Sequence, residues 1–274
     1  MDNILKQVLF YLVILFSNII QCITGFAGTV LAMPFSIILV GYDIAKPILN
    51  ILAILVSIGV VIFNYKSINF KEFFKISAVM IIGMIIGFVI LHYLSVDKNL
   101  LYFILAGIVL FFTLIGIYEN FIRKEKKVIV TSSDENTLSV IKRSETIYHR
   151  LLMHFILIAA GIVHGMFVCG GPLLVLYASR KLKDRDEFRS TLSLSWIVLN
   201  SIILIMDIAN GFFNLEVLPN MMITLGISSA ILIIALLIGN KIAKSLSRKP
   251  FMILTYVLMV ISAVSLILSA CGVI

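Results

Sequence analysis

Two stretches of this chain combine glycine with proline or threonine inside otherwise uncharged sequence. The more pronounced one, 165–172, reads Gly-Met-Phe-Val-Cys-Gly-Gly-Pro and lies in the second half of the chain. Glycine relaxes the backbone and proline fits the first position of a helix, so this order of residues ends one helix and starts another. A weaker counterpart, 21–29, reads Gln-Cys-Ile-Thr-Gly-Phe-Ala-Gly-Thr. We interpret both stretches as breaks between two helices.

Such breaks expose backbone N–H groups at the start of the second helix, where the helix dipole is positive. That arrangement suits a small anion held by main chain and hydroxyl groups, and it needs no buried lysine. The candidate substrate-binding residues are therefore those at and beside the two breaks: Thr24, Gly25, Gly28, Thr29, His164, Gly165, Cys169, Gly170, Gly171 and Pro172.

Each candidate also has a structural interpretation. Gly25 and Gly28 could serve close helix contacts, and Gly170, Gly171 and Pro172 could kink a tightly packed helix. The hydroxyls of Thr24 and Thr29 could bond their own helix backbone. His164 could carry a proton, because histidine titrates near neutral pH, or it could donate to a neighbouring carbonyl. Cys169 fits the role of a small apolar filler better than that of a reactive group.

Other residue types bound the chemistry further. No charged residue lies clearly within a predicted hydrocarbon segment, and we place Arg189 at the inner end of a span as an anchor or salt-bridge partner. Trp196 and Asn200 are expected to face the interior of that span. No grouping of His, Cys, Asp and Glu has metal-ligand spacing, so no metal or other cofactor is expected. Paired carboxylates or a nucleophile with a base at depth are also lacking, so we do not expect an enzyme.

Composition defines the class of protein. Hydrophobic residues make up 61% of the chain and charged residues 13%, with a mean hydropathy of +1.13. So little polar surface cannot cover a water-soluble core, which predicts a polytopic integral membrane protein. The net charge of +8 would suggest nucleic acid in a soluble protein. Here we assign it to cytoplasmic loops, so the lipid bilayer and not nucleic acid is the expected partner.

The order of segments predicts an internal repeat. The uncharged run 7–42 is too long for one span of about 20 residues, and three spans follow it, one with Gly83 and Gly87 on a face for close packing. A polar linker, 122–150, separates this first repeat (1–121) from a second repeat (151–274) of the same plan. In this alignment of the repeats, Thr24-Gly25 corresponds to His164-Gly165. We predict an all-α membrane protein of two inverted repeats, each a re-entrant hairpin plus three transmembrane helices, with about eight membrane segments.

Basic residues predict the orientation. If each broken segment enters and leaves on the same side, 19 of the 22 Lys and Arg residues fall on one face, in the loops 64–75, 122–150, 180–189 and 241–249. The positive-inside rule makes that face cytoplasmic. We therefore expect a multi-pass protein of the cell membrane, of bacterial or archaeal type, with both termini outside. The short arm after the second break, 172–179, favours a hairpin there.

The residues around both breaks resemble the sulfite exporter TauE/SafE family over nearly the whole chain. Segment 21–35 is similar to the family's first-repeat pattern, a Gly-Phe-Gly-like turn followed by proline. Segment 161–177 is similar to the second-repeat pattern of spaced glycines, Gly-Gly-Pro and an aliphatic run ending in tyrosine. Segment 186–192 resembles the charged start of the next span. Ala27, where glycine is usual, and 168–169, Val-Cys, depart from the family pattern.

The resemblance implies movement of small anions, often sulfur-containing ones such as sulfite, sulfoacetate or other organosulfonates, coupled to protons. It also implies a site lined by the break residues Gly25, Gly28, Gly170, Gly171 and Pro172. We therefore predict a secondary transporter that works by alternating access. Two alternatives stay open: an intramembrane enzyme that uses Cys169 or His164, and a non-transporting scaffold or sensor that binds partners through the polar linker.

Overall fold

The computed structural model describes residues 3–93, 147–168, 170–182, 184–209 and 218–272, with isolated helical positions between 100 and 118. The described residues form helices joined by short links, with no strand among them, so the all-α prediction is confirmed for this part of the chain. The elements are α1 (Asn3–Thr24), α2 (Gly28–Val40), α3 (Tyr42–Asn64), η1 (Tyr65–Ser67), α4 (Phe70–Tyr93), α6 (Ile147–Phe167), α7 (Gly171–Lys181), α8 (Arg185–Ala209), α9 (Leu218–Ser245) and α10 (Arg248–Ala270).

The outer surface of the helices is apolar. Within the described residues, five helices are long and apolar enough to cross a membrane, namely those of α1, α3, α4, α8 and α9. Large hydrophobic side chains such as Phe155 (65% exposed) and Leu237 (62% exposed) point away from the protein. Exposed apolar surface of this extent requires a lipid environment. The chain is a multi-pass membrane protein.

The two predicted helix breaks are present. Residues 25–27 separate α1 from α2, and residues 168–170 separate α6 from α7. Helix α2 has 13 residues and α7 has 11, so they measure about 20 Å and about 16 Å at 1.5 Å per residue. Both are shorter than the hydrocarbon core of about 30 Å. Helix α7 is longer than the predicted arm 172–179, yet it is still too short to span.

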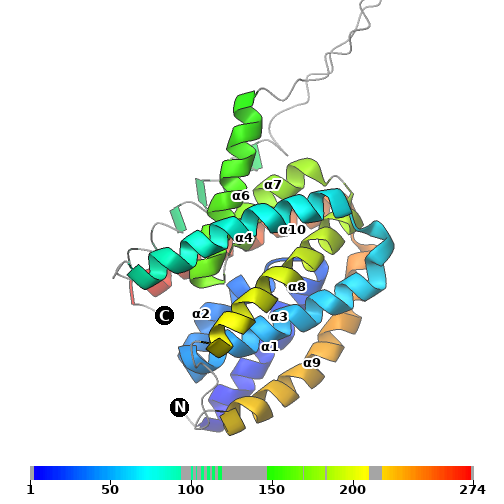
Figure 1. Cartoon of the computed structure of the whole chain (residues 1–274). Coiled ribbons are helices and arrows are strands. Elements are labelled where there is room, and N and C mark those ends of the chain that lie inside the picture. The colour runs from blue at the N-terminus through cyan, green and yellow to red at the C-terminus, as the bar shows by residue number, and fades with distance from the viewer. Residues whose placement is uncertain are drawn as a thin grey trace, which may run out of the picture.

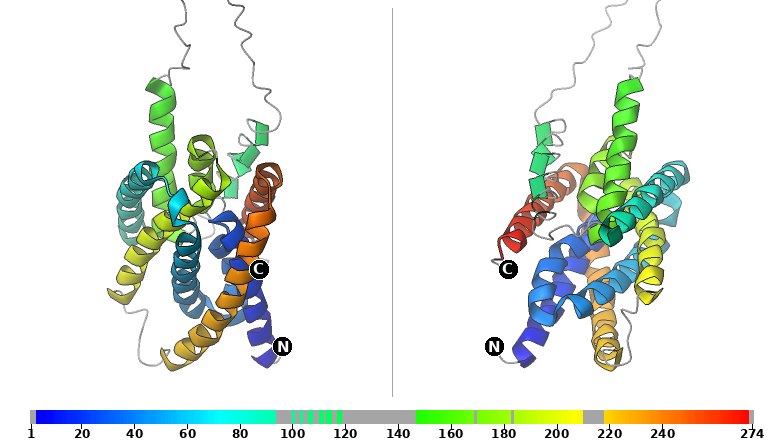
Figure 2. Two further views of the ribbon diagram at one scale, coloured as in Figure 1. Left: turned by 90° about the vertical axis from the view of Figure 1, so that its right-hand side faces the viewer. Right: turned by 60° about the vertical axis from the view of Figure 1, so that its left-hand side comes forward.

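Three pairs of helices make the most extensive contacts. Helix α1 lies along α9, α6 lies along α4, and α3 and α8 pack against each other (Figure 1). The N-terminal end of α1 and the start of α6 lie at opposite ends of the molecule (Figure 2). The chain therefore enters the two broken segments from opposite directions.

Helices α4 and α6 touch backbone to backbone. A Cβ at Gly161 would collide with the carbonyl of Met80 and would lie 3.0 Å from the Cα of Gly83. A Cβ at Gly87 would collide with the carbonyl of Ile162. The expected close-packing role of Gly83 and Gly87 is thereby confirmed, and small residues are what permit this contact.

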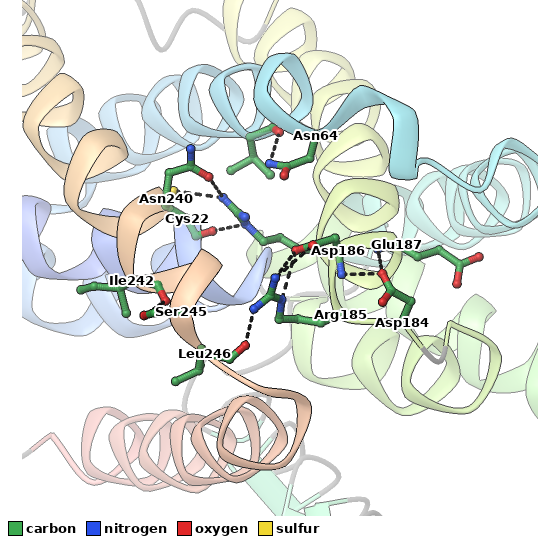
Figure 3. Close-up of polar contacts among 12 residues, drawn as sticks. Cys22, Asn64, Asp184, Arg185, Asp186, Glu187, Asn240, Ile242, Ser245 and Leu246 are labelled. Carbon is green, nitrogen blue, oxygen red and sulfur yellow. Dashed lines mark hydrogen bonds and ion pairs between the residues drawn. The ribbon is translucent and has the colours of Figure 1, made fainter.

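Three of the basic loops meet at one end of the bundle. The Asn69 amide nitrogen donates to a Glu187 carboxylate oxygen at 2.8 Å, which joins the link after α3 to the start of α8. Arg185 donates to the carbonyl of Leu246, which joins the start of α8 to the link after α9 (Figure 3). The predicted linker lies outside the described residues as far as 146, and α6 begins at Ile147.

Candidate functional site at the helix breaks

The two breaks share one backbone geometry. In the first, the Gly25 amide donates to the carbonyl of Gln21 at 2.7 Å; in the second, the Val168 amide donates to the carbonyl of His164 at 2.8 Å. Both residues have a positive φ, +84° for Gly25 and +58° for Val168. Each break therefore ends its first helix with one left-handed residue, which is a common way to terminate a helix.

The second helix of each pair also starts alike. Leu31 donates to the carbonyl of Ala27, and Leu174 donates to the carbonyl of Gly170, each at 3.1 Å. Neither Ala27 nor Gly170 caps its helix with a side-chain hydrogen bond. The first-turn N–H groups of α2 and α7 are thus not used by their own cap residues, as an anion site at a helix start requires.

This geometry corrects the alignment that the sequence suggests. We expected Thr24-Gly25 to correspond to His164-Gly165. The backbone instead matches Gly25 with Val168 and Gln21 with His164. The reason is that φ and the hydrogen-bond pattern define the end of a helix, whereas the shared glycine lies at different places in the two segments.

The two breaks meet in the interior. A Cβ at Gly171 would lie 3.3 Å from Phe26 Cδ2 and 3.4 Å from the Phe26 carbonyl oxygen. Phe26 is 5% exposed and shares one hydrophobic cluster with Leu173 of α7. The start of α7 therefore lies against the middle of the first break, and Gly171 permits this contact because it has no side chain.

Trp196 of α8 connects the breaks. Its indole nitrogen donates to the carbonyl of Gly25 at 2.8 Å. Its ring lies 5.0 Å from the ring of His164, centroid to centroid, at a tilt of 44°. One buried side chain therefore contacts the end of α1 and the last turns of α6. Trp196 is also the only tryptophan of the chain.

Arg189, one turn into α8, holds the end of α1 from the other side. Its guanidinium donates through Nε to the carbonyl of Cys22 and through Nη2 to Asn240 Oδ1 at 3.0 Å. Cys22 and Asn240 lie side by side on α1 and α9 (Figure 3). A cation at the C-terminal end of a helix complements the dipole. The Arg189 backbone also lies against the first break, because a Cβ at Gly25 would be 3.0 Å from its carbonyl oxygen.

Several polar atoms around this centre are buried without a hydrogen-bond partner. They belong to residues at most 3% exposed. The Asn200 side chain lies near the His164 ring, yet neither ring nitrogen has a partner in hydrogen-bonding geometry. The atoms are Arg189 Nη1, Ser190 Oγ, His164 Nδ1, His164 Nε2 and Asn200 Oδ1. Such a group of unsatisfied atoms calls for a functional explanation.

The candidates of the first break lie within or between packed helices. The Thr24 hydroxyl donates to the carbonyl of Ile20 at 2.8 Å, which is the self-bonding alternative stated above. A Cβ at Gly28 would collide with Gln21, so this glycine allows α2 to fold back on α1. Thr29 is buried in the first turn of α2, with 8% exposure. Of these residues, Gly25 lies nearest the contacts with α8 described above.

The candidates of the second break divide between two surroundings. Gly165 faces α4, where a Cβ would collide with Met84, so it belongs to the contact between α4 and α6. Gly170 faces back toward α6, where a Cβ would lie 2.7 Å from His164 Cβ. Pro172 is buried in the first turn of α7, as its ring geometry favours. Cys169 lies outside the described residues.

Two charged residues of α8 are buried inside the protein, which the sequence did not predict. Arg189 is 1% exposed and Asp207, near the end of the same helix, is 3% exposed. Asp207 pairs with Lys46 of α3 at 2.5 Å, whereas Arg189 contacts neutral groups. The sequence places Arg189 at the start of a span. In the structure, the last turn of α1 and a turn of α9 pack against this position and bury the side chain. The available signal was the run 189–200 of α8, which carries Arg, Ser, Thr, Trp and Asn in a hydrophobic helix.

No group of three His, Cys, Asp or Glu side chains with the spacing of a metal site occurs among the described residues. The arrangement instead offers a buried cation, an imidazole, an indole and two uncapped helix starts. These groups can bind and orient a small polar ligand.

Taken together, the lipid-facing helices and the paired breaks define a multi-pass membrane protein organised around an interior polar centre. The family model of the Sulfite exporter TauE/SafE family matches residues 10–266, and the chain therefore belongs to this family of membrane transporters. No curated protein and no solved structure gives a significant match. The resemblance stated from the break residues is confirmed.

Proposed function

We propose that the protein is a secondary transporter of a small anion, of the sulfite, sulfoacetate or organosulfonate type. The observation that carries this proposal is the meeting of two breaks with the same backbone geometry, at Gly171 and Phe26, in a member of a transporter family. Substrate sites of secondary transporters commonly lie where broken helices of two repeats face each other. The anion class follows from the family and from the two helix starts.

The mechanism that we propose is alternating access between two inverted repeats of eight membrane segments. Support comes from the packing, because α1 with α9 corresponds to α6 with α4 when the repeats are exchanged, and α3 with α8 corresponds to itself. Support also comes from the opposite directions in which the chain enters the two breaks (Figure 2). Rocking of one repeat against the other would expose the breaks to each side in turn.

The orientation that we propose places both termini outside and the protein in the cell membrane. The links joined by Asn69, Glu187, Arg185 and Leu246 lie at one end of the bundle and belong to the basic loops. Loops rich in Lys and Arg face the cytoplasm by the positive-inside rule. The convergence of these links supports a single cytoplasmic face.

Proton coupling is assigned to His164. This residue is 2% exposed, has no partner for either ring nitrogen, and contacts Trp196. An imidazole in that position can take up or release a proton as the site changes sides. A pH gradient should then drive anion flux in the wild-type protein and much less in His164→Gln.

The test is flux into liposomes that contain the purified protein. Sulfite, sulfoacetate, sulfate and acetate are compared with and without an inward pH gradient, in the wild type and in Gly171→Leu. Gly226→Leu is the matched control, because nothing lies within 4 Å of a Cβ at Gly226 in α9. We expect saturable flux of a sulfur oxyanion, its loss in Gly171→Leu, and wild-type flux in Gly226→Leu. Undiminished flux in folded Gly171→Leu would remove the breaks from the pathway.

A further inference from the structure

The guanidinium of Arg189 forms no ion pair with any described residue, and the nearby Asp186 carboxylate is paired with Arg185. Arg189 is 1% exposed. Its partners are neutral acceptors: the Cys22 carbonyl, the Cys22 sulfur at 3.5 Å and Asn240 Oδ1. An isolated buried charge is costly, so buried cations are normally paired with an anion. The position therefore lacks a negative partner.

The geometry fixes the part of the guanidinium that is left for such a partner. Nε and Nη2 are held by α1 and α9, so the plane of the group cannot turn without breaking both contacts. Nη1 is buried and has no hydrogen-bond partner. Asn240 accepts from Nη2 through Oδ1, so its two amide N–H groups remain for another acceptor. Two donors with fixed positions suit an oxyanion, which offers several acceptor oxygens.

We propose that Arg189 Nη1, with the Asn240 amide beside it, binds the transported oxyanion. This inference rests on the proposed function and assigns the substrate's negative charge to one residue. Its ligand class is a small anion with at least two acceptor oxygens on one centre, such as sulfite or a sulfonate. Neutral molecules and cations are excluded from it by the unpaired charge.

The contacts of Arg189 with α1 link anion binding to the first break. Arg189 holds the last turn of α1 through Cys22, and its backbone lies against Gly25. Trp196, two turns further along α8, holds the Gly25 carbonyl. An anion on Nη1 would offset the charge of the guanidinium and so change the strength of its contact with α1. Occupancy of the site is thereby coupled to the surroundings of the break and of Trp196.

The experiment uses Trp196 as an internal probe, because it is the only tryptophan and it donates to the break. Purified wild-type protein is titrated with sodium sulfite and with methanesulfonate, at ionic strength matched with sodium chloride, while tryptophan fluorescence is recorded. We expect a saturable change with the two oxyanions and none with chloride. Loss of one charge-assisted hydrogen bond weakens binding by about 10-fold to 100-fold, so Arg189→Gln should show at least the lower loss.

Two further variants complete the series. Arg189→Lys keeps the charge but not the fork of donors, so we expect intermediate affinity. Lys244→Gln is the matched control, because it also removes a positive charge, at an exposed position of α9 one turn after Asn240. Its apparent Kd should stay within about twofold of the wild type, since Lys244 takes no part in the hydrogen bonds that hold Arg189.

A separate variant covers the case in which Arg189→Gln does not fold. Asn240→Asp keeps the size of the side chain and places a carboxylate against Nη2. It should raise the melting temperature and abolish the fluorescence response, because the site then contains its own anion. Wild-type anion affinity in folded Arg189→Gln or Asn240→Asp would overturn this inference while leaving the proposed transport intact. Absence of any anion flux in the wild type would instead remove the proposed function.

Discussion

The two helix breaks have the same backbone and different chemistry. In the first, glycine occupies the left-handed position and α8 donates to the end of α1 through Arg189 and Trp196. In the second, Val168 occupies that position and Pro172 starts the next helix. A β-branched residue at positive φ is strained, at a cost of about 1–2 kcal/mol. The first break is therefore held by side-chain donors, and the second stores backbone strain.

This difference predicts different functions for the two breaks. The break that is held by hydrogen bonds from α8 presents a fixed cation, Arg189, to the centre. The strained break lies beside His164, whose ring nitrogens have no partners. A fixed element suits recognition of the anion, and a strained one suits movement between conformations. Substitutions that exchange the properties of the two breaks can test the comparison.

The largest effect is expected at Gly25. Alanine there combines a left-handed φ with a Cβ 3.0 Å from the Arg189 carbonyl oxygen, so we expect the free energy of unfolding to fall by about 2–4 kcal/mol. Gly41→Ala is the control, because Gly41 has φ +82° and nothing within 4 Å of a Cβ. It should lose about 1 kcal/mol. Equal losses, measured by thermal unfolding in detergent, would show that the contact with α8 does not hold this break.

A smaller loss of stability is expected at the contact between α4 and α6, the helix that ends at the second break. Gly161→Ala would push α6 away from α4, because its Cβ collides with the carbonyl of Met80. Overpacking of this kind costs about 1–3 kcal/mol. Gly226→Ala in α9 meets nothing within 4 Å and should instead gain up to about 1 kcal/mol from helix propensity. Similar melting temperatures for the two variants would contradict the backbone contact between α4 and α6.

The sequence predicts much of the fold but less of the arrangement of residues around the two breaks. Glycine and proline within uncharged runs located both breaks, and the run 7–42 was correctly divided because it is too long for one span. These features determine where a helix ends from residues close together in the chain, so they can be recognised in the sequence. The register between the breaks was wrong, because Val168 adopts a φ that its residue type does not announce.

The role of Arg189 required tertiary structure. In sequence it follows two acidic residues at the start of a span, a pattern typical of the interface. Its burial comes from α1 and α9, which bring Cys22 and Asn240 to it from 167 and 51 residues away. Similarly, Gly28 and Gly165 belong to helix contacts, and a glycine alone does not show whether its neighbour is a ligand or another helix.

The strain at Val168 predicts an inverted order of substitutions. At ordinary positions a glycine variant is less stable than an alanine variant by about 0.4–1 kcal/mol, because glycine has more freedom when unfolded. At φ +58° alanine keeps the steric conflict and glycine does not. We therefore expect Val168→Gly to melt at a higher temperature than Val168→Ala, with a difference of about 1 kcal/mol. The usual order, alanine above glycine, would show that no strain is stored there.

The smallest effect is expected at Thr24, where the comparison separates structure from binding. Its hydroxyl donates to Ile20 and accepts from the amides of Phe26 and Ala27 at 3.4 Å, distances typical of weak hydrogen bonds. The corresponding residue of the second break, Phe167, has no hydroxyl, so this group is not required for the backbone geometry. Thr24→Val should therefore lose only about 0.5 kcal/mol of stability, the low end for a hydrogen bond.

Transport distinguishes the two roles of that hydroxyl. If it serves the helix end alone, Thr24→Val should keep the wild-type apparent KM for sulfite in liposomes, and Thr24→Ser should recover the lost stability. A hydroxyl that contacts the anion would instead raise KM by about 10-fold or more when removed, because a hydrogen bond to a charged group is worth about 1.5–3 kcal/mol. That outcome would show that the first break contacts the anion directly and is not only a helix end held by Arg189.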